Sequence, residues 1–423
     1  MPTLVKRLEP HCYPAFHCIG AACEDTCCAG WIVNIDKQTY DTYQNCDDPE
    51  FAPRMQELIT INTSSTSDED FARITLSGAE CAFMTERLCG IQNKFGEDFL
   101  SLTCATYPRN LNAVDDVLER SLDFSCPEAA RIVLLDPKPM EFDLEDGPLP
   151  FPRLGRLPIL NTQLNTSVKP YPYFHDLRRF VIWLLQHRAG PLWQRLVILA
   201  AFCDQLEELS KEGMQAESLD LIALNYDAVN RGLFEEALNN HEPQPREQLE
   251  LVLDLIVARL GFDVTSPRFR ECYQDFMKAM EWTNETTMNQ LAGRYTSAAA
   301  QYYAPFMNNH EYILEHYLVT YVYRTLFPLG AQPSDRPPGP DRKAETIREH
   351  CLLMLAHYAI MQTVLIGAAA FYKEEFSTRH VIKVIQSFSK TFEHSTTFPG
   401  RALHIIADKG VANCASLAFL IRT

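Results

Sequence analysis

Helical periodicity dominates the chain beyond residue 173. Apolar residues recur there at intervals of three and four positions, the spacing that places them on one face of an α-helix. We predict helices at residues 175–188, 191–211, 218–239, 245–260, 267–282, 309–326, 343–373, 377–392 and 411–421. The pattern therefore predicts an all-helical domain over residues 174–423.

One helical run stands out by its hydrophobicity. Residues 351–372 contain no Asp, Glu, Lys or Arg and are about as long as a membrane span. His357, Gln362 and Thr363 interrupt the run, and the central helix of a large helical domain is also apolar on all sides. We interpret the run as a buried core helix, with a membrane span or a membrane-surface contact as the alternative.

The first 135 residues show shorter elements. Asp36 can cap a helix over residues 37–45, and a hairpin is expected around Ser77-Gly78. A further helix is expected over residues 92–103. The eight prolines between residues 136 and 173 predict an extended linker.

The predicted fold class is therefore mainly α. An N-terminal cysteine-cluster domain with short strands and helices occupies residues 1–135, and the all-helical domain follows the linker.

Charge narrows the classes of partner. The net charge is −17, from 55 acidic against 38 basic residues, and no strongly basic stretch occurs. Nucleic-acid binding is disfavoured because it requires concentrated positive charge, whereas an acidic surface suits a basic, lysine-bearing protein. The N-terminus has no apolar signal-peptide run, so we expect a cytosolic protein with reduced thiols.

Cysteines gather at the start of the chain, where ten of the fourteen lie within the first 126 residues. In a reducing compartment this clustering favours metal binding over disulfides. Ser125 and Glu128 can form a capping box that places Cys126 at a helix N-terminus, where a thiolate is favoured. The candidate metal ligands are Cys18, Cys23, Cys27, Cys28, Cys81, Cys89, Cys104 and Cys126. His11 and His17 are alternative ligands.

The spacing of these cysteines is irregular. Cys23-x₃-Cys27 fits half of a zinc site, but the three downstream cysteines at 81, 89 and 104 form no regular second half. The irregularity favours an iron–sulfur cluster, with zinc as the alternative. The radical-SAM pattern Cys-x₃-Cys-x₂-Cys is not completed, because its third position is Gly30.

We expect the downstream sulfurs to converge on Cys23 and Cys27 in the fold. Adjacent cysteines do not readily point the same way, so we expect only one of Cys27 and Cys28 to join Cys23 at a metal atom. The remaining isolated cysteines are interpreted as small buried hydrophobic residues. These are Cys12, Cys46, Cys203, Cys272, Cys351 and Cys414.

Other chemical motifs are few. The chain has no G-x-G, Walker A, H-E-x-x-H or G-x-S-x-G sequence, so any nucleotide-like cofactor is held unconventionally. Tyr107-Pro108-Arg109 lies on a predicted turn, and we take Tyr107 and Arg109 as candidate cofactor-binding residues. Arg109 can hold a carboxylate through two hydrogen bonds, or it can form a structural ion pair.

The motifs together resemble the flagellin lysine-N-methylase family (FliB). The resemblance rests on Phe16-His17-Cys18-x₄-Cys23-x₃-Cys27-Cys28-x-Gly30-Trp31 with Ile35-Asp36, on Cys104-x₂-Tyr107-Pro108-Arg109, and on Ser125-Cys126-Pro127-Glu128-Ala129-Ala130. It covers residues 16–131, and the helical remainder agrees in length and character.

The resemblance implies an S-adenosylmethionine (SAM)-dependent enzyme that methylates lysine ε-amines of flagellin in the cytosol. It also implies a cysteine-bound [4Fe-4S] cluster, and it leaves peripheral membrane association and oligomer formation open. The alternative from another class is a non-enzymatic metal-binding protein, in which a zinc or iron–sulfur site secures the fold and the helical domain binds a partner.

Overall fold

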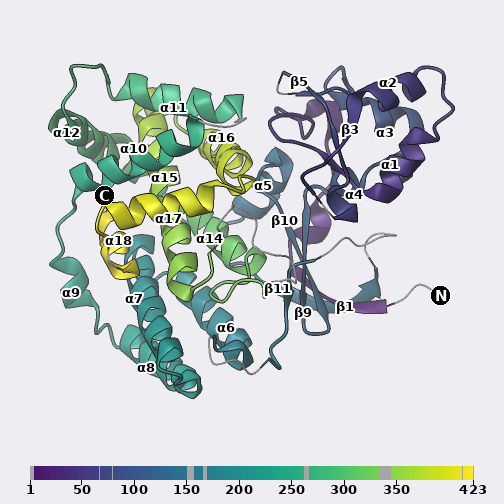
Figure 1. Ribbon diagram of the computed structural model, residues 1–423. Coiled ribbons are helices and arrows are strands. Elements are labelled where there is room, and N and C mark those ends of the chain that lie inside the picture. Colours follow the sequence, from purple (N-terminus) through teal and green to yellow (C-terminus); the bar gives the residue numbers. More distant parts are fainter. Residues whose placement is uncertain are drawn as a thin grey trace.

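The computed structural model describes residues 4–65, 67–78, 80–149, 157–164, 169–261, 266–332, 344–411 and 413–422. Figure 1 shows a small N-terminal lobe, a five-stranded sheet and a larger helical body, with the sheet between the other two. Most of the regular structure is helical, which confirms the mainly α fold class.

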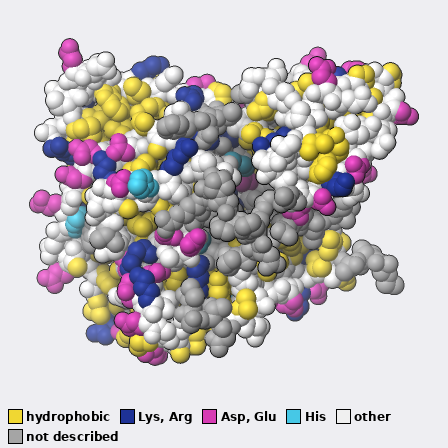
Figure 2. All heavy atoms as spheres, in the orientation of Figure 1, with side chains coloured by type: hydrophobic (Ala, Val, Ile, Leu, Met, Phe, Trp, Pro, Cys, Tyr) yellow, Lys and Arg dark blue, Asp and Glu magenta, His cyan; other side chains and the backbone are white. Residues whose placement is uncertain are grey.

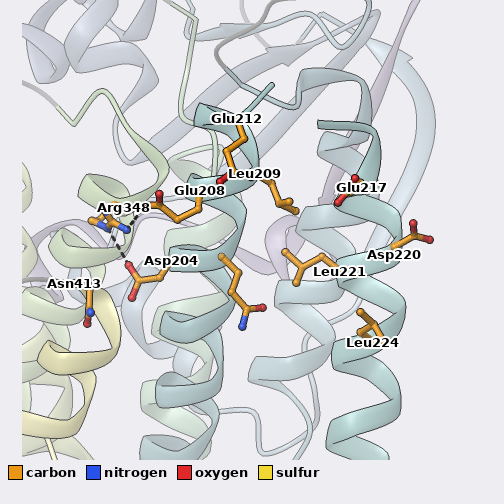
Figure 3. A pocket seen from close by; sticks show the side chains of 11 residues that line it. Asp204, Glu208, Leu209, Glu212, Glu217, Asp220, Leu221, Leu224, Arg348 and Asn413 are labelled. Atoms are coloured by element: carbon orange, nitrogen blue, oxygen red, sulfur yellow. Dashed lines mark hydrogen bonds and ion pairs between the residues drawn. The ribbon is translucent and has the colours of Figure 1, made fainter. Parts of the chain in front are cut away.

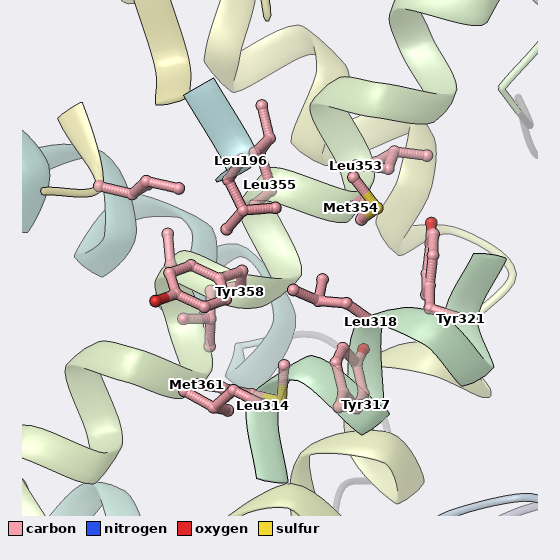
Figure 4. Close-up of a cluster of buried hydrophobic side chains, with 14 of the residues drawn as sticks. Leu196, Leu314, Tyr317, Leu318, Tyr321, Leu353, Met354, Leu355, Tyr358 and Met361 are labelled. Carbon is pink, nitrogen blue, oxygen red and sulfur yellow. The ribbon is translucent and has the colours of Figure 1, made fainter. Parts of the chain in front are cut away.

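The helical body surrounds α15 (Ile347–Tyr372). Leucine, methionine and tyrosine side chains from α7, α14 and α15 interlock at its centre (Figure 4). The other long helices of the body follow the predicted positions closely. They are α6 (Phe174–Leu185), α7 (Leu192–Lys211), α8 (Ser218–Asn230), α10 (Pro245–Leu260), α11 (Pro267–Ala279), α14 (Tyr312–Arg324), α16 (Thr378–Phe388) and α18 (Cys414–Leu420).

α15 is the apolar run singled out by its composition. Its most hydrophobic window is buried along its whole length inside the protein, which is the environment of a soluble protein's core helix. Packing is so close that a Cβ on Gly367 would lie 2.5 Å from the Phe276 ring of α11. These contacts support the core-helix interpretation, because protein side chains cover the faces that a membrane span would turn to lipid.

Two expected helices are divided, and several helices were not predicted. The predicted helix at 218–239 forms as two helices, α8 and α9 (Glu235–Asn239), with Gly232 between them at φ +65°. The 92–103 run becomes α3 (Gly90–Phe95) and α4 (Leu102–Thr106), separated by Gly96 at φ +86°. A glycine in this left-handed conformation ends a helix without steric cost. The longest unpredicted helices are α12 (Met288–Ala298) and α17 (Phe398–Asp408).

The sheet has the strand order β11-β1-β10-β9-β12. β1 (Leu4–Pro10) runs parallel to β10 (Val117–Leu122) and antiparallel to β11 (Phe142–Pro148). β9 (Arg109–Val114) pairs with β10 and with β12 (Ile159–Leu160). β11 and β12 both come from residues 136–173, the stretch whose proline content predicts a linker, and residues 150–156 and 165–168 of it lie outside the described residues.

The N-terminal lobe has a hydrophobic core of its own, which runs from Val33 to Leu100. α1 (Lys37–Gln44) begins at Asp36, whose Oδ1 accepts a hydrogen bond from Thr39 N–H at 3.0 Å, as the sequence predicts. The hairpin at Ser77-Gly78 is also present, as β5 (Leu76–Ser77) paired with β6 (Glu80–Cys81). The lobe is completed by α2 (Phe51–Leu58), β2 (Asn34–Ile35), β3 (Ile59–Ile61), β4 (Ala72–Ile74), β7 (Met84–Thr85) and β8 (Leu88–Cys89).

Two turns of π-helix interrupt the helical body. Ala299–Tyr303 follows α12 and leads into α13 (Ala304–Met307), and Ser389–Glu393 follows α16. π-Helical turns are rare and occur often at functional sites, so both mark positions of interest. Figure 2 shows Asp and Glu side chains spread over both lobes of the face in view, interspersed with Lys and Arg.

Candidate functional site

The cysteine-bearing loop, residues 18–31, lies at the junction between the N-terminal lobe and the helical body. Lys390, in the second π-helical turn, donates to Asp25 Oδ2 at 2.9 Å and to the Thr26 carbonyl at 2.7 Å. Gln386 of α16 donates to Asp25 Oδ2 at 2.7 Å. Gly30 has φ +85° and packs against the aliphatic part of the Lys390 side chain. A Cβ at position 30 would lie 3.1 Å from Lys390 Cε. A buried lysine therefore fastens the loop to the helical body.

A second set of contacts fixes the middle of the loop. α5 (Pro127–Leu134) carries Arg131, whose guanidinium pairs with Glu24 at 2.6 Å and with Glu128 at 2.6 Å. Arg268 of α11 donates to the Glu24 carbonyl at 3.3 Å. The loop is thus held by two elements that lie far apart in the sequence.

The first thiol group contains five cysteines. The Cys28 side chain is hydrogen-bonded to the sulfurs of both Cys27 and Cys89. Cys81 and Cys104 lie near enough that a charge on Cys89 or Cys27 raises their pKa values. The backbone reinforces this, because Cys81 N–H donates to the Cys28 carbonyl at 2.6 Å. The side chains of Cys27 and Cys28 therefore meet, contrary to the expectation that adjacent cysteines point apart.

Hydrogen bonding gives the thiols of this first group different pKa values. The bond with Cys28 lowers the pKa of Cys27 to about 7 and that of Cys89 to about 6. The same two bonds, together with burial, raise the pKa of Cys28. Burial raises the pKa of Cys104 to about 12. The arrangement thus favours a thiolate at Cys27 and Cys89, the form that binds metals.

The second thiol group contains Cys18, Cys23 and Cys126. Charges on Cys23 and Cys18 contribute to the raised pKa of Cys126, although burial is the main cause and brings it to about 12. The charge of Cys23 thus acts on Cys126, whereas that of Cys27 acts on Cys81 and Cys104, and whether Cys23 and Cys27 bind one metal stays a prediction.

Cys126 is at the N-terminus of α5, as predicted, but without the predicted capping box. Cys126 itself is the N-cap residue, and no side chain caps the helix. The Ser125 hydroxyl contacts the Tyr107 hydroxyl at 2.9 Å, while Glu128 pairs with Arg131. Burial outweighs the helix N-terminus, which explains why the pKa of Cys126 is raised rather than lowered.

Among the residues that the structure describes, no set of three or more His, Cys, Asp or Glu side chains converges on a single point in the geometry of one metal ion. The first thiol group nonetheless brings together five soft sulfur donors from four separate chain segments. A [4Fe-4S] cluster is held by Cys thiolates, so these donors match it in chemical type alone, and the cluster stays a prediction.

Tyr107 and Arg109 lie in different surroundings. The Tyr107 ring stacks on Trp31 with centroids 5.9 Å apart, which places it beside the cysteine-bearing loop. The Arg109 guanidinium lies 5.1 Å from the centre of the Phe16 ring, and its charge lowers the pKa of Tyr13, which burial raises overall. No ion pair of Arg109 occurs within the described part of the chain, so a role in holding a carboxylate remains a prediction.

A buried charged network adjoins the loop, and sequence reasoning missed it. Asp123 pairs with Arg324 at 3.1 Å and with His394 at 3.2 Å, and Arg324 also pairs with Glu393 at 2.5 Å. Tyr317 donates to Glu393 at 2.8 Å. Arg324 and Tyr317 lie on α14, Asp123 directly follows β10, and Glu393 and His394 lie at the end of the second π-helical turn and just after it. None of them belongs to a motif, so no local signal could have grouped them.

A third thiol group lies in the helical body. Cys351 of α15 is hydrogen-bonded to both Cys203 of α7 and Cys414 of α18. The three side chains are fully buried, as the sequence interpretation of isolated cysteines expects. Their convergence was not expected, because they lie on three helices that are distant in the sequence.

An open cavity of about 600 Å³ lies beside this third thiol group, between α7 and α8. Figure 3 shows Arg348 reaching toward Asp204 and Glu208, to which its guanidinium pairs at 3.0 Å and 2.9 Å. Glu212, Glu217 and Asp220 form the rest of the acidic lining, with Leu221 beside them. α7 and α8, which contribute most of the cavity lining, lie on the side of the helical body away from the N-terminal lobe (Figure 1).

The fold and the site define a mainly α protein that presents cysteine thiols and a buried charged network at the junction of its two lobes. A model of the FliB lysine N-methylase C-terminal domain matches residues 178–420. This match covers more than half of the chain, which therefore belongs to the FliB lysine N-methylase family.

Individual relatives agree. The chain is 25% identical to the lysine-N-methylase of Salmonella typhimurium over 250 residues, 58% of this chain and 59% of that protein. It shows the same identity and coverage against the lysine-N-methylase of Salmonella choleraesuis. It is 32% identical to the flagellar biosynthetic protein FliU of Salmonella muenchen over 133 residues, 31% of this chain and 79% of that protein. The alignment thus spans less than two thirds of each lysine-N-methylase, and no solved structure matches.

Proposed function

We propose that this protein is a SAM-dependent lysine N-methyltransferase that acts on flagellin and requires a cysteine-bound [4Fe-4S] cluster. The observation that carries the proposal is membership of the FliB lysine N-methylase family through residues 178–420. The flagellar name of the FliU relative supports a flagellar substrate, and the acidic net charge suits a lysine-bearing partner.

The residues proposed to hold the cluster are the five cysteines of the first thiol group. Three thiolates suffice to hold a [4Fe-4S] cluster while leaving one iron open to the amino and carboxylate groups of SAM. Lys390 lies beside this group, where its charge favours the thiolate of Cys27. Trp31 donates its indole N–H to the Cys27 carbonyl at 2.8 Å and so fixes the backbone that carries the sulfur.

We place the protein in the cytoplasm, where flagellin is available before export and thiols stay reduced. Peripheral membrane association and oligomer formation belong to the same proposal, and neither requires a membrane-spanning segment in α15.

The test is an anaerobic methylation assay. Purified protein is incubated with SAM, a reductant and flagellin, and the flagellin is examined by mass spectrometry. The expected result is a mass gain of methyl size on lysine, from protein that is coloured and contains iron.

Two outcomes contradict the proposal. Absence of any methyl gain with iron-loaded protein removes the enzymatic assignment. Colourless protein with stoichiometric zinc and no iron favours the alternative, a metal-binding protein whose helical body binds a partner.

A further inference from the structure

A carboxylate–imidazole pair, Asp123 and His394, lies where the cysteine-bearing loop meets the helical body. Asp123 directly follows β10, and His394 directly follows the second π-helical turn. Nε2 of His394 lies 3.2 Å from Oδ1 of Asp123. The Asp123 side chain is 9% exposed, whereas that of His394 is 24% exposed. Solvent or a substrate can therefore reach the imidazole, while the carboxylate behind it is closed off.

Asp123 is held in one orientation by groups from several elements. Its Oδ1 accepts from the Ser125 backbone N–H at 2.8 Å and from the Ser389 hydroxyl at 3.4 Å. Its Oδ2 accepts from Arg324 at 3.1 Å and from Asn110 at 3.4 Å. Burial alone would raise the pKa of this carboxyl, but the charges of His394 and Arg324 and these hydrogen bonds hold the pKa well below its usual range. Asp123 therefore remains an anion at neutral pH.

The anion determines the state of the imidazole. Because Asp123 can only accept, Nε2 of His394 carries the donated hydrogen and Nδ1 holds the lone pair. Nδ1 has no hydrogen-bond partner among the residues described. Burial lowers the pKa of His394, but the charge and hydrogen bond of Asp123 outweigh burial and raise it overall, with Arg324 opposing and Glu393 assisting.

The surroundings connect this pair to the cysteines. The Trp31 ring lies 5.9 Å from the His394 ring, and Trp31 also stacks on Tyr107. Trp31 is hydrogen-bonded to the Cys27 carbonyl, so one aromatic residue separates the imidazole from the first thiol group. A reachable base thus adjoins the proposed cluster site.

We propose that His394, oriented by Asp123, is the base that removes a proton from the target lysine. The proposal rests on the proposed function, by a polar methyl transfer. A lysine ε-ammonium has no lone pair, and with an ordinary pKa of about 10.4 only about one lysine in 2,500 is neutral at pH 7. A base beside the methyl donor overcomes this obstacle.

The proposed step balances as follows. Nδ1 of His394 takes one proton from the ε-ammonium, and the nitrogen lone pair so released attacks the methyl carbon of SAM. The new N–C bond forms as the methyl–sulfur bond breaks, and that electron pair returns to sulfur, which changes the sulfonium into a thioether. The imidazolium, stabilised by Asp123, then releases its proton to solvent.

The test measures kcat and KM for flagellin methylation from pH 6 to 9.5 in the wild type, His394→Gln and His404→Gln. His404 is a matched control, because it also pairs with a carboxylate, Asp408 at 3.2 Å, yet is 76% exposed and lies on α17. We expect kcat of the wild type to fall on the acid side in a one-proton step. His394→Gln should lower kcat about 100-fold or more with KM little changed and should abolish the acid step, whereas His404→Gln should match the wild type.

A second measurement does not depend on turnover. The imidazole of His394 is titrated by NMR in the wild type and in Asp123→Asn, with His394→Gln used to assign its signal. We expect a pKa above the ordinary 6.5 in the wild type and a lower value in Asp123→Asn. An unshifted value would show that Asp123 does not control the imidazole and would overturn the orienting role.

The outcomes separate this proposal from the proposed function. A wild type that methylates lysine while His394→Gln keeps the acid step overturns the base assignment alone. A loss of activity in His394→Gln that is equal at all pH values and accompanied by a lower melting temperature shows a structural role and also overturns it. A wild type that transfers no methyl at all overturns the proposed function, and the base assignment with it.

Discussion

The first and third thiol groups differ in how their cysteines are brought together. The first, Cys27, Cys28, Cys81, Cys89 and Cys104, lies on loops, short strands and helix starts, and its members range from exposed to buried. The third, Cys203, Cys351 and Cys414, lies on the faces of three packed helices and is fully buried. Sulfurs on irregular backbone at a surface can rearrange around a metal, whereas sulfurs on packed helices are fixed by core packing. Convergence of thiols alone therefore does not identify a metal site.

The most direct test of this difference between the groups is to remove one cysteine from each and measure bound iron. Cys89→Ala should reduce bound iron from about four atoms per chain to nearly none, because Cys89 is one of the two thiols in this group whose pKa is lowered toward the metal-binding thiolate. Cys351→Ala should leave the iron content unchanged. Iron analysis and the visible spectrum of anaerobically purified protein measure both, and equal retention in the two variants would show that the first thiol group is not the site.

Cys23→Ala tests whether Cys23 contributes to the same iron site as Cys89. Cys23 lies with Cys18 and Cys126 in the second thiol group, so its loss should affect iron less than the loss of Cys89. Complete iron loss in Cys23→Ala would show that the two groups serve one cluster.

Acid should destabilise the region of the third group through His350, the neighbour of Cys351. Burial and the nearby Lys169 charge lower the pKa of His350 to about 3. The unfolded chain takes up a proton near pH 6.5 that the folded state does not take up, so stability is full above pH 6.5 and falls as the pH drops toward 3. His350→Gln should remove about 1 kcal/mol of this loss per pH unit.

Urea unfolding at pH 7, 6, 5 and 4 measures the effect, with His404→Gln as the control for an exposed histidine. If stability fell with pH equally in His350→Gln and the wild type, His350 would not be the cause of the acid destabilisation. His357 would then be the next candidate, because it is another buried histidine whose pKa is lowered, to about 4.

The smallest expected effect concerns packing. Cys351→Ser should lower the free energy of unfolding by about 1–2 kcal/mol, because it replaces a fully buried, polarizable sulfur with a smaller and more polar hydroxyl. Cys18→Ser, at an exposed position, should change it by less than about 0.5 kcal/mol. Chemical denaturation of metal-free protein measures both, and equal costs would mean that burial does not set the cost of replacing a sulfur at these two positions.

The sequence predicts features whose cause is local. Asp36 caps its helix, Ser77-Gly78 turns its hairpin and the apolar run of α15 occupies the core, because each depends on residues within a few positions. α17 was missed because Pro399 and Gly400 suggest a turn, although proline also suits a first helical turn. α12 was missed because its stripe is weak, although Thr287 and Gln290 form a capping box that could have revealed it.

The sequence indicates candidate cysteine ligands, which stay a prediction, but it does not indicate which distant residues the fold brings beside them. Clustering in the sequence indicated the cysteines, but it could not indicate that Lys390 binds Asp25 of their loop, 365 positions away. The Asp123–His394 pair joins residues 271 positions apart and belongs to no motif. Such pairings follow from tertiary packing, which periodicity and spacing do not report.

The strand order also sets the timing of events during synthesis. β1 leaves the ribosome first among the strands, yet its neighbours in the sheet are β10 and β11, the latter ending at Pro148. At about 5–20 residues per second, β1 waits on the order of ten seconds for both partners. During that interval the cysteines between β1 and β10 have no completed sheet to fix them. Metal delivered to the nascent chain would meet mobile thiols, so correct loading is favoured after residue 148 has emerged.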